Sequence, residues 1–208
     1  MLEYEKYHDY VKIIGCGDET FQNLVIPDTI DGLPIKIIGA EAFKDCESLT
    51  NVTIPDSVTS IGAEAFRNCT NLANITIPDS VTSIGEEAFR NCTNLASITI
   101  PDSVTTIGQS AFQECWKLIE VIIENADCEI IEERVFEEIY KTGGKGATIC
   151  NFYHYSDKEV GNARWDLFEY EYYYGSFYGV IIGHKDSTAQ AYARSCGYRF
   201  KAIEDEET

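Results

Sequence analysis

The stretch Ile54-Pro-Asp-Ser-Val-Thr59 decides the fold of this chain, because it returns unchanged at Ile77–Thr82 and Ile100–Thr105. The three starts are 23 residues apart. Other positions recur with the same period: Ile61, Ile84 and Ile107; Gly62, Gly85 and Gly108; Phe66, Phe89 and Phe112; Cys69, Cys92 and Cys115; Leu72, Leu95 and Leu118. A fixed period of this length indicates stacked units that bury their apolar faces against one another. The sequence therefore predicts a solenoid.

Each unit begins with a short strand. Ile75 and Ile77 alternate with Asn74 and Thr76, which is typical of a strand with one buried face and one face in water. Pro78 lacks a backbone donor and should end the hydrogen-bonded ladder. Equivalent strands of successive units are therefore expected to stack as a parallel sheet.

The rest of the unit is expected to return the chain to the next strand. Val81 and Ile84 point inward from a second extended segment, and Gly85 permits backbone conformations closed to other residues, so it should turn the chain. Glu86–Cys92 is long enough for about two helical turns. In the first unit, five surplus residues lie around Asp31-Gly32, a dipeptide favoured in tight hairpins.

The pattern Leu-x-x-Ile-x-Ile-Pro-x-x-Val-x-x-Ile-Gly-x-x-Ala-Phe-x-x-Cys resembles the BspA-type leucine-rich repeat. The resemblance covers residues 20 to 136 and a C-terminal segment around Ser187. It implies a role in adhesion or protein recognition on bacterial surfaces, without enzymatic activity. The expected fold class is α/β: a right-handed leucine-rich-repeat solenoid with short parallel strands, second short extended segments and short helical turns, capped at both ends.

We expect one leucine-rich-repeat domain over residues 1–208. Residues 1–20 should form an N-terminal cap hairpin, and residues 21–136 the repeats, of which the last is degenerate. Residues 137–208 hold an irregular aromatic-rich insertion and a C-terminal cap helix, with Ser187 as N-cap and Gly197 at its end.

The charge balance narrows the range of partners. The chain has 16 basic and 35 acidic residues, a net charge of −19, which disfavours nucleic acid and anionic lipid. No apolar run approaches the ~20 residues of a membrane span, so we expect no membrane insertion. We expect a monomer with a protein partner that the sequence does not identify. Met1–Tyr4 does not begin a secretory signal, so a cytoplasmic protein or a removed leader is expected, although the resemblance implies the cell surface.

Four of the 8 cysteines, Cys46, Cys69, Cys92 and Cys115, occupy one position of successive units. Stacked equivalents point the same way about 4.8 Å apart, too far for a disulfide, so they are expected to be free, buried thiols. The sequence does not pair Cys16, Cys128, Cys150 and Cys196.

Catalytic and cofactor motifs are missing from the sequence. His8, His154 and His184 show no metal-ligand spacing, and no serine or cysteine lies in a nucleophile motif. We therefore expect no catalytic residues, no metal and no cofactor. Aspartates recur after the prolines at Asp28, Asp56, Asp79 and Asp102, where a local turn is favoured over a calcium site.

Two regions are candidate binding surfaces. The first is the wet face of the strands, and the second is an aromatic passage between Trp165 and Tyr178, which could be a cap or a contact surface. The candidate residues are Asn51, Thr53, Asn74, Thr76, Ser97, Thr99, Glu120, Ile122, Trp165, Tyr170, Tyr172 and Tyr174.

The function expected from these features is a non-enzymatic binding module for protein–protein interaction or adhesion through the solenoid surface. One alternative is an intracellular scaffold with the same fold. A more remote one is an enzyme built on the insertion at residues 141–178.

Overall fold

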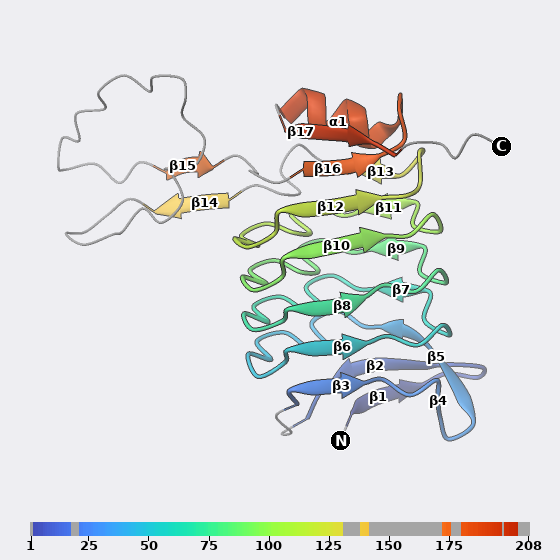
Figure 1. The fold of residues 1–208 in the computed structure, drawn as a ribbon. Coiled ribbons are helices and arrows are strands. Elements are labelled where there is room, and N and C mark those ends of the chain that lie inside the picture. Colours follow the sequence, from blue (N-terminus) through green and yellow to red (C-terminus); the bar gives the residue numbers. More distant parts are fainter. Residues whose placement is uncertain are drawn as a thin grey trace. The chain divides into compact units, whose positions relative to one another are not determined.

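The computed structural model describes residues 2–17, 21–130, 138–141, 172–175, 180–196 and 198–203. The chain divides into two compact units, one of Met1–Glu138 with Ser176–Thr208 and one of Ile139–Gly175. The first unit is the solenoid (Figure 1). The strands β14 (Glu138–Lys141) and β15 (Tyr172–Gly175) form a two-stranded sheet. A single domain over the whole chain stays a prediction.

One side of the solenoid, here called face A, is a stack of strands running its whole length (Figure 1). Two sheets make it, in the orders β3-β6-β8 and β10-β12-β16-β17, and each pairs its strands in parallel. The strands are β3 (Asn23–Val25), β6 (Asn51–Thr53), β8 (Asn74–Thr76), β10 (Ser97–Ile100), β12 (Glu120–Ile123), β16 (Val180–Gly183) and β17 (Arg199–Ala202). The expected solenoid with short parallel strands is confirmed.

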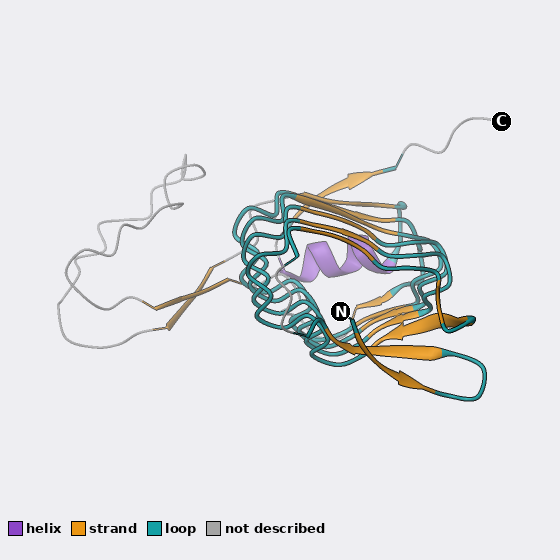
Figure 2. Ribbon diagram, turned by 90° about the horizontal axis from the view of Figure 1, so that it is seen from below, coloured by secondary structure: helices purple, strands orange, loops and turns teal. Residues whose placement is uncertain are grey.

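The opposite side, here called face B, is one sheet in the order β1-β2-β5-β7-β9-β11-β13, with β4 paired to β5. Figure 2 looks along the stack and shows the two strand faces on opposite sides of the core. The strands are β1 (Glu3–Lys6), β2 (Val11–Gly15), β4 (Thr29–Ile30), β5 (Leu33–Ile38), β7 (Ser60–Ile61), β9 (Ser83–Ile84), β11 (Thr106–Ile107) and β13 (Glu129–Ile130). Apart from β1 with β2 and β4 with β5, the pairs are parallel.

The surplus residues of the first coil form a two-residue hairpin between β4 and β5. Thr29 pairs with Pro34 and Ile30 with Leu33. Asp31 and Gly32 both have positive φ, 51° and 79°, as a type I′ turn requires. The loop expected at Asp31-Gly32 is confirmed.

The third side of each coil is a run of hydrogen-bonded turns, here called the turn side, and not the short helix that the sequence predicts. The N–H of Arg67 donates to the carbonyl of Glu64, but Glu64 and Asn68 have φ of 55° and 60°. Because these left-handed residues interrupt the helical conformation, alternate N–H groups point out of the coil. The N–H of Phe66 donates to the carbonyl of Ala88 in the next coil at 2.7 Å.

The regular recurrence of glycine in the coils has a different cause from the one expected. Positive φ in this part of the coil falls on Glu64 and Glu87 rather than on Gly62 and Gly85. A Cβ at Gly85 would lie 2.5 Å from the backbone nitrogen of Ala63 in the preceding coil, closer than real Cβ contacts. Glycine is therefore required by the close approach of the coils.

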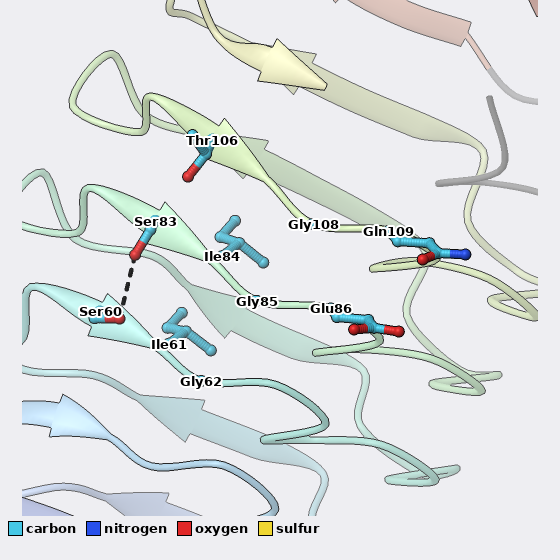
Figure 3. A pocket seen from close by; sticks show the side chains of 10 residues that line it. All are labelled: Ser60, Ile61, Gly62, Ser83, Ile84, Gly85, Glu86, Thr106, Gly108 and Gln109. Carbon is cyan, nitrogen blue, oxygen red and sulfur yellow. Dashed lines mark hydrogen bonds between the residues drawn. The ribbon is translucent and has the colours of Figure 1, made fainter. Parts of the chain in front are cut away.

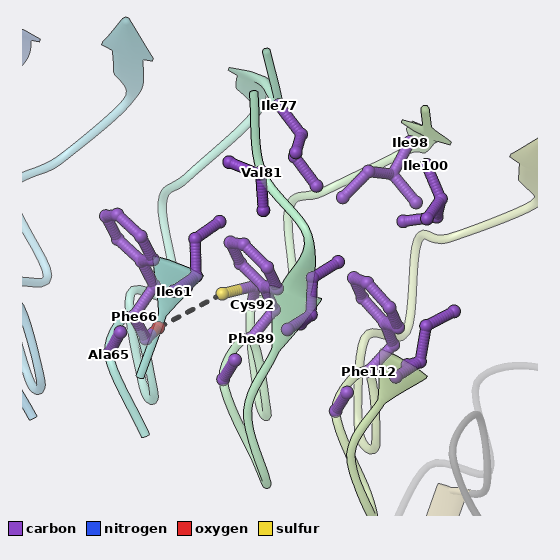
Figure 4. Packing of buried hydrophobic residues seen from close by; sticks show 14 of the residues in the cluster. Ile61, Ala65, Phe66, Ile77, Val81, Phe89, Cys92, Ile98, Ile100 and Phe112 are labelled. Carbon is purple, nitrogen blue, oxygen red and sulfur yellow. Dashed lines mark hydrogen bonds between the residues drawn. The ribbon is translucent and has the colours of Figure 1, made fainter. Parts of the chain in front are cut away.

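In the core, side chains from equivalent positions of successive coils stack on one another (Figure 4). The rings of Phe43, Phe66, Phe89 and Phe112 stack with centroids 5.1, 5.3 and 5.3 Å apart, and all four are buried. The cysteines that recur once per coil, here called the column cysteines, are Cys46, Cys69, Cys92 and Cys115. All four are free, as expected, although Cys46 is only partly buried. The Cys92 thiol donates a hydrogen bond to the carbonyl of Phe66 at 3.2 Å.

A hairpin and a helix lie at the two ends of the solenoid, while its right-handedness and the capping role of these elements stay predictions. The β1–β2 hairpin pairs with β5 at one end. At the other, helix α1 (Thr188–Cys196) packs against β13, β16 and β17 and buries Ala189, Tyr192 and Ala193. Ser187 is the helix N-cap, because its Oγ accepts from the N–H of Gln190 at 3.2 Å. Among the described residues, no helix has the length and apolar character to cross a membrane.

Candidate functional site

Face A brings the predicted strand residues together in two columns. In every strand of face A the alternate side chains point away from the core, while Val52, Ile98 and Val121 between them are buried. The register aligns one column at Asn23, Asn51 and Asn74, then Ser97, Glu120, Val180 and Arg199. The second column holds Val25, Thr53 and Thr76, then Thr99, Ile122, Ile182 and Lys201. The eight strand residues predicted from the sequence all lie in these columns.

Hydrogen bonds between side chains order the first column. The Nδ2 of Asn51 donates to Oδ1 of Asn23 at 2.5 Å, and the Nδ2 of Asn74 donates to Oδ1 of Asn51 at 2.7 Å. Each amide therefore lies in a fixed orientation before any partner arrives. Such preorganisation lowers the entropy lost on binding.

The character of face A changes from its N-terminal to its C-terminal strands. From Asn23 to Thr99 the two columns contain no charged residue, although the chain has 35 acidic residues. The columns then pass through Glu120 and Ile122 and end on Arg199 and Lys201.

Six members of the columns were missed by sequence reasoning. Asn23 and Val25 repeat the alternation of the later strands, and this signal could have placed them. The other four, Val180, Ile182, Arg199 and Lys201, follow the insertion, so the 23-residue period does not reach them.

Face B has a groove with a volume of about 420 Å³ (Figure 3). Its strand side carries the hydroxyls of Ser60, Ser83 and Thr106, and Ser60 and Ser83 hydrogen bond to each other at 3.2 Å. Glu86 and Gln109, which directly follow Gly85 and Gly108, also line the groove. Among the described residues that line the groove there is neither a histidine nor a cysteine.

The remaining predicted residues are only partly described. Trp165 and Tyr170 lie outside the described residues, as does most of the insertion at residues 141–178. Tyr172 and Tyr174 are in β15, where the backbone alone is described. Within the described ranges, no group of three or more His, Cys, Asp or Glu residues could hold a metal ion.

The repeat itself matches a family model, the BspA type leucine rich repeat region, in 6 copies over residues 16–142. The chain belongs to the BspA-type leucine-rich repeat family. A comparison with curated proteins found no match. Because the family model covers the coils of both strand faces, family membership accounts for the solenoid and leaves the ligand open.

Solved structures of bacterial leucine-rich repeat proteins resemble this BspA-type protein. The T. pallidum leucine-rich repeat protein TpLRR is 36% identical, with a TM-score of 0.59 over 62% of this chain and 61% of that one. A leucine-rich repeat protein from Bacteroides capillosus is 30% identical, with a TM-score of 0.52 over 58% of this chain and 92% of that one. The pneumococcal vaccine antigen PcpA is 13% identical, with a TM-score of 0.56 over 97% and 48%, and shares the fold.

The BspA-type solenoid is a fold of protein-interaction and surface-adhesion modules, and proteins of this repeat family are typically non-enzymatic. The chain spans about three fifths of the length of TpLRR. The activity and partners of a whole relative therefore do not transfer to it directly.

Proposed function

We propose that this protein is a non-enzymatic binding module that contacts a protein partner through the outward columns of face A. One observation carries the proposal: in a chain with 35 acidic residues, neither column contains a charged residue from Asn23 to Thr99. In the same region, hydrogen bonds between side chains fix the orientation of the asparagine amides. Charged residues are depleted in the centres of protein interfaces, and a preordered surface loses less entropy on binding.

The columns also offer two kinds of contact to one partner. The asparagine and threonine positions supply hydrogen-bonding groups, and Ile122, Val180 and Ile182 supply apolar area at the C-terminal strands. A protein surface with polar and apolar parts matches this arrangement better than a small ligand, which needs an enclosing pocket. The aromatic residues Trp165, Tyr170, Tyr172 and Tyr174 remain a second candidate contact region on sequence grounds.

The test is a binding comparison between two variants of the intact chain. Asn74→Arg with Thr76→Arg places bulky cations in the middle of face A, and Ser60→Arg with Ser83→Arg does the same on face B. Proteins captured by the unaltered chain should be retained by the face B variant and lost by the face A variant, provided that circular dichroism shows both folded. If the captured proteins bind the face A variant but not the face B variant, the binding site is the groove on face B instead.

Adhesion and intracellular scaffolding differ in where the protein is found. We propose adhesion, because the family resemblance implies the bacterial surface. Fractionation of the producing cells with an antibody to this chain should place it in the surface or secreted fraction. Recovery from the cytoplasm alone would favour the scaffold.

A further inference from the structure

Two cysteines that the sequence does not pair lie against each other at the N-terminal end of the solenoid. Cys16 directly follows β2, and Cys46 lies in the turn side between β5 and β6. Their Sγ atoms are 2.8 Å apart, longer than the ~2.05 Å of a disulfide bond but within direct contact. Both residues are free and partly exposed.

The other members of the cysteine column have a different environment. The thiols of Cys69 and Cys92 donate to the carbonyls of Phe43 and Phe66 at 3.0 and 3.2 Å, and both residues are fully buried. Cys115 repeats this with Phe89 at 3.1 Å. Cys46, at the same position of its coil, contacts a second thiol, that of Cys16.

We propose that Cys16 and Cys46 are the site of a disulfide, formed by exchange with a low-molecular-weight disulfide of the glutathione class, which fastens the N-terminal hairpin to the first coil. The inference is independent of the binding function proposed above. Its consequence is mechanical, because the bond would join β2 to the turn side across 30 residues of chain.

The chemistry is a two-electron exchange in two steps. One protein thiolate attacks the small disulfide, forming a mixed disulfide and releasing one small thiol. The second protein thiolate then attacks the protein sulfur of the mixed disulfide, forming the Cys16–Cys46 bond and releasing the second small thiol. The two protein thiols are oxidised, the small disulfide is reduced, and both protons end on the released thiols.

Burial and the contact between the two sulfurs act on different steps of this exchange. Burial raises the pKa of the Cys46 thiol to about 12, and the hydrogen bond with Cys16 adds to this. Since the thiolate is the nucleophile, burial slows attack by the Cys46 thiol. Whichever cysteine takes up the small disulfide, the sulfur of the other lies 2.8 Å away and completes the bond.

The experiment is peptide mapping of the full chain after equilibration with oxidised glutathione, acid quenching and alkylation. A peptide linking Cys16 to Cys46 is expected, with Cys69, Cys92 and Cys115 alkylated only after denaturation. Cys16→Ser should abolish the linked peptide. Cys196→Ser, at a partly buried cysteine outside the pair, should leave it unchanged.

A second readout uses stability. Closing a loop of this length should raise the thermal midpoint of the unaltered chain by roughly 5–15 °C, whereas the midpoint of Cys16→Ser should not respond to the oxidant. The proposal is overturned if Cys16 and Cys46 both remain alkylatable in oxidised glutathione. Glutathione that stays on either cysteine without formation of the linked peptide would overturn it as well.

Discussion

Single residues recur in this chain because each coil meets its neighbour in the same way. Phe89 lies between Phe66 and Phe112 with ring centroids 5.3 Å from each. The sequence correctly predicts that these rings and the column cysteines face the core. It does not predict the hydrogen bond from the Cys92 thiol to the Phe66 carbonyl, because that carbonyl is oriented by the turns.

Phe89→Ala should lower the free energy of unfolding by ~3–5 kcal/mol, because it removes a fully buried ring from the middle of the stack. Val25→Ala, at a residue 71% exposed on face A, is the control and should change it by less than about 0.5 kcal/mol. Urea denaturation monitored by circular dichroism measures both. Equal, small effects of the two substitutions would mean that Phe89 is not in the core.

Gly85→Ala should lower the free energy of unfolding by ~1–3 kcal/mol, because the new Cβ would meet the backbone of Ala63 at 2.5 Å. Gly32→Asn is the matched control, since Gly32 has a φ of 79° that asparagine tolerates and open space around its Cβ position. Chemical denaturation of both variants checks the prediction. A tolerated alanine at Gly85 would show that the coils do not approach as closely as described.

At the scale of elements, strands follow from the sequence better than turns do. The alternation at Asn74–Ile77 predicts a strand with one buried and one wet face, and β8 forms within it, at Asn74–Thr76. The segment Glu86–Cys92 has the length of two helical turns, but Glu87 and Asn91 adopt left-handed φ of 51° and 58°. Hydrogen bonds from the N–H groups of Glu87 and Asn91 to the next coil stabilise this left-handed conformation. The sequence of a single coil does not predict these bonds, because their acceptors belong to the neighbouring coil.

A ladder of ion pairs runs along the turn side from coil to coil. Lys44 lies 2.9 Å from Glu41 and 2.8 Å from Glu64, and Arg67 lies 2.8 Å from Glu64 and 2.9 Å from Glu87. Arg90 continues it toward Glu114 at 3.0 Å. Each cation therefore joins a carboxylate of its own coil to one of the next.

Glu64→Gln should lower stability near pH 7 by up to about 1 kcal/mol, and the loss should vanish in acid. Hydrogen bonds from Lys44 and then Arg67 lower the pKa of the Glu64 carboxyl. A carboxylate whose folded pKa is depressed stabilises the protein above its unfolded value of about 4.3, and this contribution disappears as pH falls through the folded value.

Unfolding by urea between pH 7 and pH 3 measures this difference. Glu47→Gln, at an exposed carboxylate outside the ladder, is the matched control. A loss at Glu64 that persisted unchanged at pH 3 would mean that the effect comes from packing rather than charge.

At the scale of the whole molecule, stacking converts one sequence pattern into a continuous surface. The wet positions Asn51 and Thr53 could be assigned to a shared face from the period alone, and the structure extends their columns to Arg199 and Lys201. The extension could not be predicted, because β16 and β17 join the sheet after a long insertion without the repeat. The contact of Cys16 with Cys46 escaped prediction because Cys16 lies before the stretch in which the 23-residue period is regular.

The most direct test of the repeat architecture is to delete one coil and measure thermal unfolding. Removing residues 75–97, one full period of 23, joins Asn74 to Ile98 and restores the pattern of a face A strand. This variant should unfold cooperatively at a somewhat lower midpoint, because it loses one set of contacts between neighbouring coils. Removing residues 75–96 instead leaves one extra residue and reverses the inward and outward positions at the junction, so its cooperative transition should be lost or its midpoint should fall much further. Equal midpoints for the two deletions would contradict a solenoid built on a 23-residue register.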